Sequence, residues 1–226
     1  MIVYLIPGLG FDNRIFKNLK LSEIEYKYLN WIEPKENEKI KNYANRLSQG
    51  IKETSEKIIL IGHSFGGIVA QEIAALRPIH QIILISSIKS GKELPFHFRI
   101  MKPLFIHKLF SKELTAITIK FWGKNHDYET IEEQDFVTDM VNNQSNYNLQ
   151  WALRQLSIWD KPKSNHETKI IQIHGELDKT FPVKLISEPS RIIQKAGHFM
   201  VYKKATLLND IIESELTNKN GMQQWL

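Results

Sequence analysis

The segment Gly62–Gly66, which reads G-H-S-F-G, constrains the fold of this chain more than any other. It directly follows the apolar run Lys57–Ile61, which is typical of a strand buried on both faces, and it opens a helical pattern over Phe65–Leu76. In so tight a strand-to-helix turn, the residues two before and two after the central serine approach too closely for side chains. Glycines at both positions therefore predict that the Ser64 hydroxyl projects above a sheet.

The surroundings of this motif favour a functional serine over a mere turn. A bare G-x-S-x-G occurs in many loops, because Gly and Ser are common there. Here a strand precedes it and a helix follows it, and that context indicates an exposed nucleophile. The N–H of Phe65, at the start of the predicted helix, faces the same spot and can stabilise a negatively charged oxygen.

Short β-branched runs alternate with helical stretches along most of the chain, which predicts an α/β fold with a mostly parallel central sheet flanked by helices. The expected strands are Ile2–Ile6, Ile24–Trp31, Lys57–Ile61, Gln81–Ser86, Ile170–His174 and Arg191–Gln194. The expected helices are Tyr43–Ile51, Phe65–Leu76 and a closing helix through Leu207, Leu208, Ile211, Ile212 and Leu216. The polar residues within Ile24–Trp31 place that strand at a sheet edge.

The interval from Ser87 to Trp159 departs from this alternation. It has no clear buried-strand run and shows helical periodicity instead, as at Leu149, Leu153 and Leu156. We expect an α/β core over residues 1–86 and 160–217, with residues 87–159 inserted as a helical cap that selects the substrate without doing chemistry. Residues 218–226 are predicted to be a flexible tail.

A serine alcohol is a poor nucleophile unless a base removes its proton, so a histidine and an orienting carboxylate must accompany Ser64. After a turn of this kind, the acid and then the histidine follow along the chain. Asp178 follows the strand Ile170–His174 in the turn G-E-L-D, and His198 follows the last strand in A-G-H-F, where Gly197 permits the backbone turn. Glu176 is the alternative acid, but it lies nearer the strand end.

The loop after the first strand, Pro7–Gly10, is glycine-rich and allows close backbone approach. We expect the N–H of Leu9 to act there as an oxyanion donor beside that of Phe65. His63 and His174 are interpreted as hydrogen-bonded packing residues.

These motifs resemble, in order and spacing over nearly the whole chain, those of the α/β-hydrolase superfamily, and more narrowly its small bacterial cap-bearing esterases and thioesterases. The resemblance implies acyl transfer to water through a Ser-His-Asp triad, on a small-molecule acyl substrate and without a cofactor. Two departures stand out: Pro7-Gly8 replaces the family's usual His-Gly, and the chain begins at what resembles the family's third strand, which implies a trimmed sheet. Phe199 stands where related hydroxynitrile lyases carry Lys.

Aromatic residues are candidates for an acyl pocket, although aromatics in a helical cap equally form its own core. The candidates are Phe96, Trp122, Trp151 and Phe199, with Phe98 and Trp159 also considered. A second group of candidates is cationic and can either bind an anionic substrate portion, such as a CoA phosphate, or form the wet face of the cap. These are His97, Arg99, Lys102 and Lys108.

Composition excludes several classes of function. The net charge of +5 comes from lysines scattered along the chain, without the basic and aromatic run of a nucleic-acid groove. No apolar run approaches the ~20 residues of a membrane span, and no signal peptide is evident, so we expect a cytoplasmic protein. The absence of cysteine excludes disulfides, thiolate zinc sites and a Cys nucleophile, and no other metal-ligand spacing occurs.

Two other classes of function stay open from the sequence. A ligand-binding protein without catalytic activity can use the same fold, and a lyase or a cofactor-free acyl transferase can use the same three side chains. The sequence also leaves open whether the protein is a monomer or a homodimer.

Overall fold

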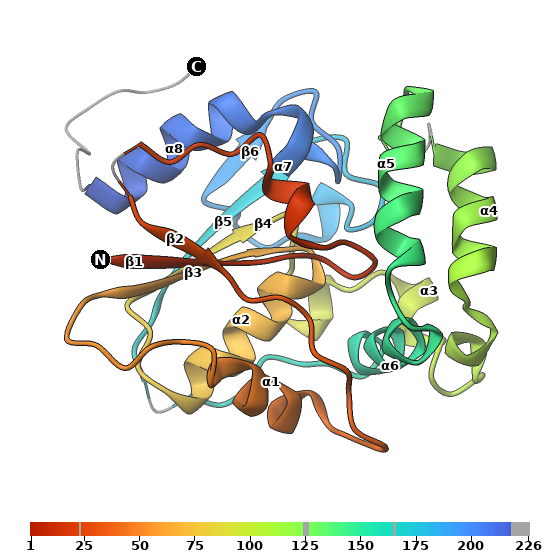
Figure 1. Ribbon diagram of the computed structural model, residues 1–226, viewed down its shortest axis with the longest axis horizontal. Helices are drawn as coiled ribbons and strands as arrows, with labels where there is room; N and C mark the ends of the chain where they lie inside the picture. The colour runs from red at the N-terminus through yellow and green to blue at the C-terminus, as the bar shows by residue number, and fades with distance from the viewer. Residues whose placement is uncertain (23, 124–126, 165, 218–226) are drawn as a thin grey trace.

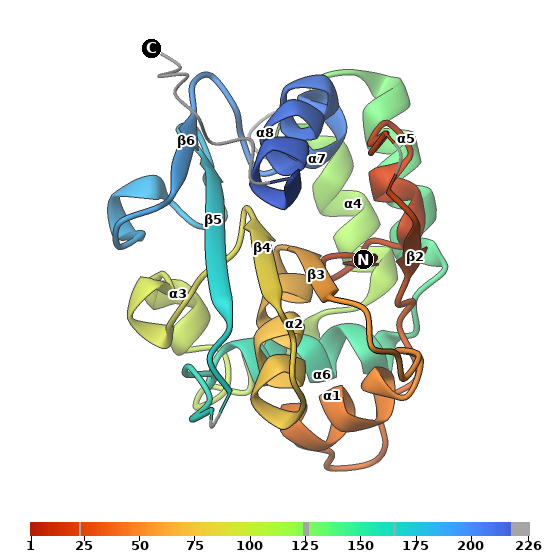
Figure 2. The same cartoon turned by 90° about the vertical axis from the view of Figure 1, so that its left-hand side faces the viewer.

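The computed structural model describes residues 1–22, 24–123, 127–164 and 166–217, so the predicted tail 218–226 lies outside the described residues. Its centre is a six-stranded sheet in the order β2-β1-β3-β4-β5-β6, in which every neighbouring pair is parallel (Figures 1 and 2). The strands are β1 (Ile2–Ile6), β2 (Tyr26–Tyr28), β3 (Ile58–His63), β4 (Gln81–Ile85), β5 (Lys169–Gly175) and β6 (Arg191–Ile193).

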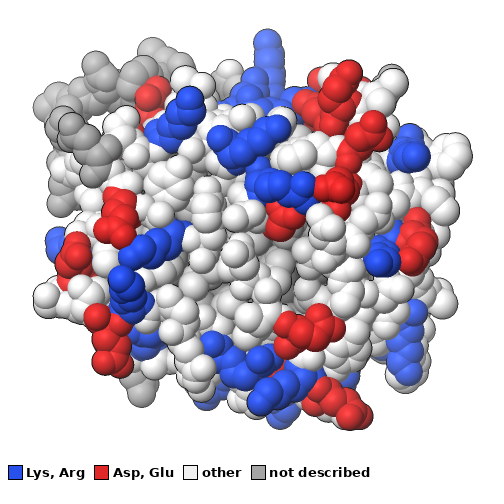
Figure 3. All heavy atoms as spheres, viewed as in Figure 1, with Lys and Arg blue, Asp and Glu red and all other residues white. Residues whose placement is uncertain are grey.

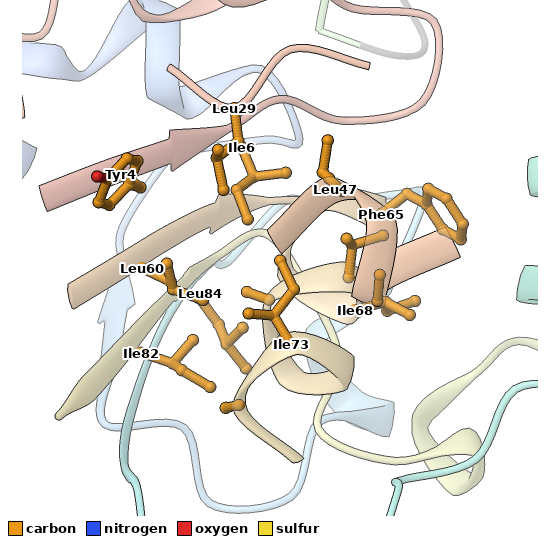
Figure 4. Close-up of a cluster of buried hydrophobic side chains, with 14 of the residues drawn as sticks. Tyr4, Ile6, Leu29, Leu47, Leu60, Phe65, Ile68, Ile73, Ile82 and Leu84 are labelled. Carbon is orange, nitrogen blue, oxygen red and sulfur yellow. The ribbon is translucent and has the colours of Figure 1, made fainter. Parts of the chain in front are cut away.

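Because successive side chains of a strand point to opposite faces, the apolar strands supply two cores at once. Tyr4, Leu60 and Leu84 lie on one face, with Phe65 and Ile68 of the following helix packed against them (Figure 4). The alternate strand positions form the core of the other face. They are Val3, Leu5, Ile59, Ile61, Ile83, Ile85, Ile171 and Ile173. Burial on both faces explains why these strands read as continuous apolar runs.

Helices cover both faces of the sheet. Helices α1 (Ile40–Ser48) and α2 (Phe65–Leu76) pack on the first face, and α7 (Met200–Lys203) and α8 (Ala205–Thr217) pack on the second (Figure 2). The strands other than β2, and α2, match the predicted ranges to within a few residues. The edge strand β2 is much shorter than the predicted Ile24–Trp31, because it pairs only with β1.

Between β4 and β5 the described residues form helices and no strand. These helices are α3 (Phe96–Arg99), α4 (Lys112–Trp122), α5 (Ile131–Asn142) and α6 (Asn146–Leu156). Helices α4 and α5 lie beyond the carboxyl ends of the strands (Figure 1). The short 3-10 helices are η1 (Asn13–Phe16), η2 (Gly91–Glu93), η3 (Ile106–Leu109) and η5 (Val183–Leu185).

The inserted segment, residues 87–159, shares its buried side chains with the two cores of the sheet. Trp151 and Leu156 of α6 belong to the first core, and Val137 and Met140 of α5 belong to the second. The Trp151 ring lies 4.4 Å from that of Tyr43 between centroids, so α6 packs directly on α1. The insertion is thus fixed to the sheet domain by apolar packing.

Lysine, arginine and acidic side chains are interspersed on the face seen in Figure 3. Within the described ranges, no helix is long and apolar enough to cross a membrane.

Candidate active site

Ser64 occupies the turn between the last residue of β3 and the first residue of α2, with φ of 52°. Positive φ is unfavourable for a residue with a side chain and persists only where neighbouring structure enforces it. Hydrogen bonds to the end of β4 do so here. The Ser64 N–H donates to the Ile85 carbonyl at 2.9 Å, and the Ser87 hydroxyl donates to the Ser64 carbonyl at 2.6 Å.

The glycines around Ser64 are required for two different reasons. A Cβ on Gly62 would stand 2.6 Å from the carbonyl carbon of Gly66, so the turn closes on itself as the motif predicts. A Cβ on Gly66 would instead collide with the carbonyl oxygens of Ile6 and Pro7. Gly66 therefore lets α2 start against the end of β1, a contact that the motif alone does not indicate.

The structure brings Ser64, His198 and Asp178 into one hydrogen-bonded chain. The Ser64 Oγ lies 2.9 Å from His198 Nε2, and His198 Nδ1 lies 2.8 Å from Asp178 Oδ2. The other carboxylate oxygen, Oδ1, accepts the N–H groups of Thr180 and Phe181 at 2.9 Å each. All three side chains come from segments that follow the carboxyl ends of strands β3, β5 and β6, where a parallel sheet gathers them.

The environment of Asp178 favours its ionised form. Burial by itself raises the pKa of this carboxyl, but the charge and hydrogen bond of His198, with His174 and the Phe181 N–H, outweigh burial and hold the pKa of Asp178 below its usual value. An ionised Asp178 is suited to hold the proton on His198 Nδ1, which leaves Nε2 free to accept the proton of Ser64.

Glu176, the alternative acid, points elsewhere. Its carboxylate accepts the N–H of Lys195 at 2.9 Å on the exposed side of the turn.

Two further histidines are buried beside the three side chains. His63 Nε2–H donates to the His198 carbonyl at 3.0 Å, and His174 Nε2–H donates to the Phe181 carbonyl at 2.7 Å. Burial, followed by the neighbouring His198, lowers the pKa of His63 to about 3, and burial likewise lowers the pKa of His174. Both are therefore neutral near pH 7, and their Nε2–H groups hold the backbone carbonyls of His198 and Phe181.

No family model matches the sequence, and no curated protein has significant sequence similarity to it. Solved structures do match over nearly the whole chain. A thermophilic esterase has a TM-score of 0.69 and 22% identity, covering 96% of this chain and 89% of its own. An esterase from Exiguobacterium antarcticum has a TM-score of 0.71 and 17% identity, with coverages of 96% and 92%. MenH from S. aureus has a TM-score of 0.74 and 19% identity, with coverages of 96% and 94%. The chain has the α/β-hydrolase fold.

In an α/β-hydrolase fold, the oxyanion donors are expected at the residue after the nucleophile and in the loop after an early strand. Phe65 is the first residue of α2, where an N–H has no acceptor within its own helix. Leu9 and Phe65 line the same cavity as Ser64. A Cβ on Gly8 would stand 3.0 Å from Ser64 Cβ, so this glycine lets the loop after β1 pass directly beside the serine.

A cavity of about 430 Å³ opens at Ser64 and His198. Its other walls are mostly apolar and come from the β1 loop, the Asp178 loop and the inserted helices. They are Leu9, Gly10, Phe11, Phe65, Phe98, Phe110, Thr115, Thr118, Ile119, Tyr128, Val137, Val141, Leu149, Leu153, Leu156, Thr180 and Phe181. The two threonine hydroxyls of α4 donate to backbone carbonyls of their own turns, so that wall is effectively apolar.

Of the aromatic residues that the sequence suggested for this pocket, Phe98 lines it, whereas Phe96, Trp151, Trp159 and Phe199 do not. Phe96 is 75% exposed on the outside of α3, whereas Phe98, two residues later, faces the cavity. Trp151 is buried in the first core, where its Nε1–H donates to the Glu38 carbonyl. Phe199 is buried in the second core, stacked on Tyr202 at 4.7 Å. The side chain of Trp122 lies outside the described residues.

The cationic candidates lie away from the cavity. The Arg99 guanidinium donates to the carbonyls of Leu94, Gly91 and Lys92, so it serves the fold of its own loop. Lys102 lines a separate surface hollow beside α1, and His97 and Lys108 are not among the residues that line the cavity.

Sequence reasoning missed the wall that α4 contributes. Thr115, Thr118 and Ile119 stand at i, i+3 and i+4, the spacing of one helical face, and this was the available signal. It was obscured because the opposite face of α4 also carries apolar residues, Leu114 and Ile117, which are exposed.

Proposed function

We propose that this protein is a serine hydrolase that cleaves a carboxylic ester or thioester of a small or medium, mainly apolar acyl group. The observation that carries the proposal is the hydrogen-bonded chain Ser64–His198–Asp178, whose Ser64 and His198 line an apolar cavity. The names of two structural neighbours, both esterases, are consistent with it. Because other neighbours are named epoxide hydrolase and bromoperoxidase, the fold by itself does not select the reaction.

In the proposed reaction, His198 Nε2 takes the proton of Ser64 as Oγ attacks the carbonyl carbon of the substrate. The tetrahedral intermediate collapses to an acyl-enzyme, and His198 gives the proton to the departing alcohol or thiol. His198 Nε2 then takes a proton from a water molecule, which attacks the acyl carbon. The bond from that carbon to Ser64 Oγ breaks, the acid is released, and His198 returns the proton to Ser64. Asp178 keeps His198 in the productive tautomer and stabilises its charged form.

We assign the oxyanion site to the backbone N–H groups of Leu9 and Phe65. The geometry that supports this assignment is the close passage of the Gly8 loop beside Ser64 and the start of α2 at Phe65. Donors that are held in place by the fold stabilise the developing charge without first having to reorient.

The cavity supports the acyl preference. Its volume lies within the ~300–1,000 Å³ typical of small-molecule sites, and among the residues that the structure describes, no Lys or Arg lines it. This composition favours an aliphatic or aromatic acyl chain over an anionic one. We propose residues 87–159 as a cap, because Phe98 and Phe110, with residues of α4, α5 and α6, form much of the wall around that chain.

Labelling with a fluorophosphonate probe tests the proposal. Wild-type protein is expected to form a covalent adduct at Ser64, and Ser64→Ala to form none while keeping its fold. Ser22→Ala, which removes an exposed hydroxyl, is the matched control and should label like the wild type. A series of p-nitrophenyl esters and CoA thioesters of increasing acyl length then defines the substrate class. A wild-type protein that neither labels nor hydrolyses any of these esters would instead favour the ligand-binding alternative.

A further inference from the structure

A single peptide group, the one that joins His198 to Phe199, is held at both of its ends. Its carbonyl oxygen accepts His63 Nε2–H at 3.0 Å, and its N–H donates to Asp127 Oδ2 at 3.2 Å. His63 is the last residue of β3, next to Ser64, whereas Asp127 belongs to the segment inserted between β4 and β5. The backbone that carries His198 is therefore clamped between the sheet and the insertion.

The position of the Asp127 carboxylate is fixed by its contacts with Lys203. Its side chain is 19% exposed and lies 3.3 Å from Lys203 Nζ through Oδ1, which leaves Oδ2 for the Phe199 N–H. The Lys203 ammonium also approaches the carbonyl oxygen of Asp127 at 3.4 Å. The backbone of Asp127 has φ of 76°, a conformation that side-chain-bearing residues rarely adopt.

Gly197 supplies a second sign of this contact. From the sequence, Gly197 was expected to permit the backbone turn that presents His198. Its φ is not positive, and the residue with positive φ in this loop is Lys195. What Gly197 permits is close approach. A Cβ there would stand 2.7 Å from Cγ and Oδ2 of Asp127. Gly197 is therefore required because the Asp127 carboxylate lies too close to leave room for a side chain at this position.

From this geometry we propose that Asp127 is a positioning residue for His198, so that the inserted segment controls the alignment of the catalytic base. The proposal rests on the proposed hydrolase function. Asp127 acts through the backbone, because a planar peptide group anchored at both ends cannot rotate, and its orientation sets the direction of the His198 side chain. Without the Asp127 bond, the peptide group keeps only the His63 anchor, and the ring, still held by Asp178, can shift so that His198 Nε2 is misaligned with Ser64 Oγ.

The test compares three substitutions at Asp127. Asp127→Ala and the size-matched Asp127→Leu both remove the acceptor, and each is expected to lower kcat by about 10-fold to 100-fold with little change in KM, since small misplacements of catalytic groups have costs of this order. In Asp127→Asn, the amide oxygen can accept the Phe199 N–H while the NH₂ replaces Oδ1, because the Lys203 ammonium keeps Glu129 and Glu133 as partners. This variant is expected to keep most of kcat. The Leu variant decides the matter if the Ala variant does not fold.

Glu129→Ala is the matched control. Glu129 also pairs with Lys203, at 3.1 Å, but it is 66% exposed and is not among the partners of the 198–199 peptide group. This variant should retain wild-type kcat. A folded Asp127→Ala or Asp127→Leu protein with wild-type kcat would overturn the proposal, and so would equal losses in the Asn and Leu variants, because the loss would then follow charge rather than the hydrogen bond.

Amide hydrogen exchange at Phe199, followed by NMR, provides a readout that does not depend on activity. Faster exchange at this amide in Asp127→Leu, with protection restored in Asp127→Asn, is expected. If the wild type proved inactive on every ester while exchange followed this pattern, the proposed function would fail and the clamp would stand. Unchanged exchange in the Leu variant would refute the clamp, whatever the activity.

Discussion

Replacing Asp178 with Asn is the most informative single change at this site, because the structure dictates how the new amide must sit. Oδ1 accepts two backbone N–H groups, from Thr180 and Phe181, at 2.9 Å each. An amide NH₂ at that position would face two donors. The oxygen of the new amide must therefore take the Oδ1 position, and its NH₂ must face His198 Nδ1 in place of Oδ2.

This orientation forces the wrong tautomer on His198. A donor facing Nδ1 requires Nδ1 to be unprotonated, so the proton moves to Nε2, and Nε2 can no longer accept the proton of Ser64 2.9 Å away. In serine proteases with a Ser-His-Asp triad, the same Asp-to-Asn change reduces kcat by ~10⁴, which corresponds to about 5 kcal/mol of transition-state stabilisation. We expect a loss of ~10³–10⁴ in kcat here by the same mechanism.

Initial rates on a p-nitrophenyl ester, with thermal unfolding to confirm the fold, measure this effect. Glu176→Gln is the matched control, since its carboxylate bonds the Lys195 N–H and its replacement should have only a minor effect on kcat. If Asp178→Asn kept a tenth or more of the wild-type rate, or if Glu176→Gln were the more damaging change, the assignment of the acid would be wrong.

Three further outcomes are expected. Ser64→Ala should abolish ester hydrolysis, as followed by product absorbance, with little change in Tm, because it removes one hydroxyl; near-native turnover would contradict the mechanism. Ile119→Phe, which narrows the cavity beside α4, should shift the preference in the ester series toward shorter acyl chains, whereas Phe96→Ala should leave it unchanged because Phe96 is exposed. A larger shift in Phe96→Ala than in Ile119→Phe would show that the acyl chain binds elsewhere. The pKa of His63 falls from 6.5 to about 3 on folding, so below pH 6.5 the unfolded chain binds a proton that the folded protein excludes. The free energy of unfolding should therefore decrease by about 1.4 kcal/mol for each unit by which the pH is lowered. Urea unfolding at pH 7 and pH 5 should show this loss in the wild type and a smaller one in His63→Gln; equal losses would show that His63 is not its source.

Much of the fold could be predicted from the sequence because the strands are buried on both faces. Such strands are apolar at most positions, and β1, β3 and β4 therefore stand out as nearly continuous apolar runs. Gly62 could also be predicted, since the local backbone of the turn around Ser64 leaves no room for a side chain there, whereas Gly66 is small because of its contact with the end of β1. The sequence pattern overestimates the length of the edge strand β2, because that length depends on how many of its residues pair with β1.

The meeting of Ser64, Asp178 and His198 could also be predicted from the sequence, because each follows a strand and parallel strands have their carboxyl ends at the same edge of the sheet. The residues that line the cavity could not be predicted in this way. Whether an aromatic residue such as Phe96, Phe98 or Trp151 faces substrate, solvent or core depends on how the inserted helices dock, and each of these aromatics has the same local signature.

Local geometry is thus written in the sequence, whereas contacts between distant segments arise only when the chain is folded. Ser64 and Gly62 belong to the first kind, since the turn that they form involves a few consecutive residues. The clamp of Asp127 on the Phe199 N–H belongs to the second, because its partners are 72 residues apart and no motif marks Asp127. Hydrogen bonds of this kind depend on the packing of whole helices against the sheet, so only the tertiary structure decided that the inserted segment reaches the histidine.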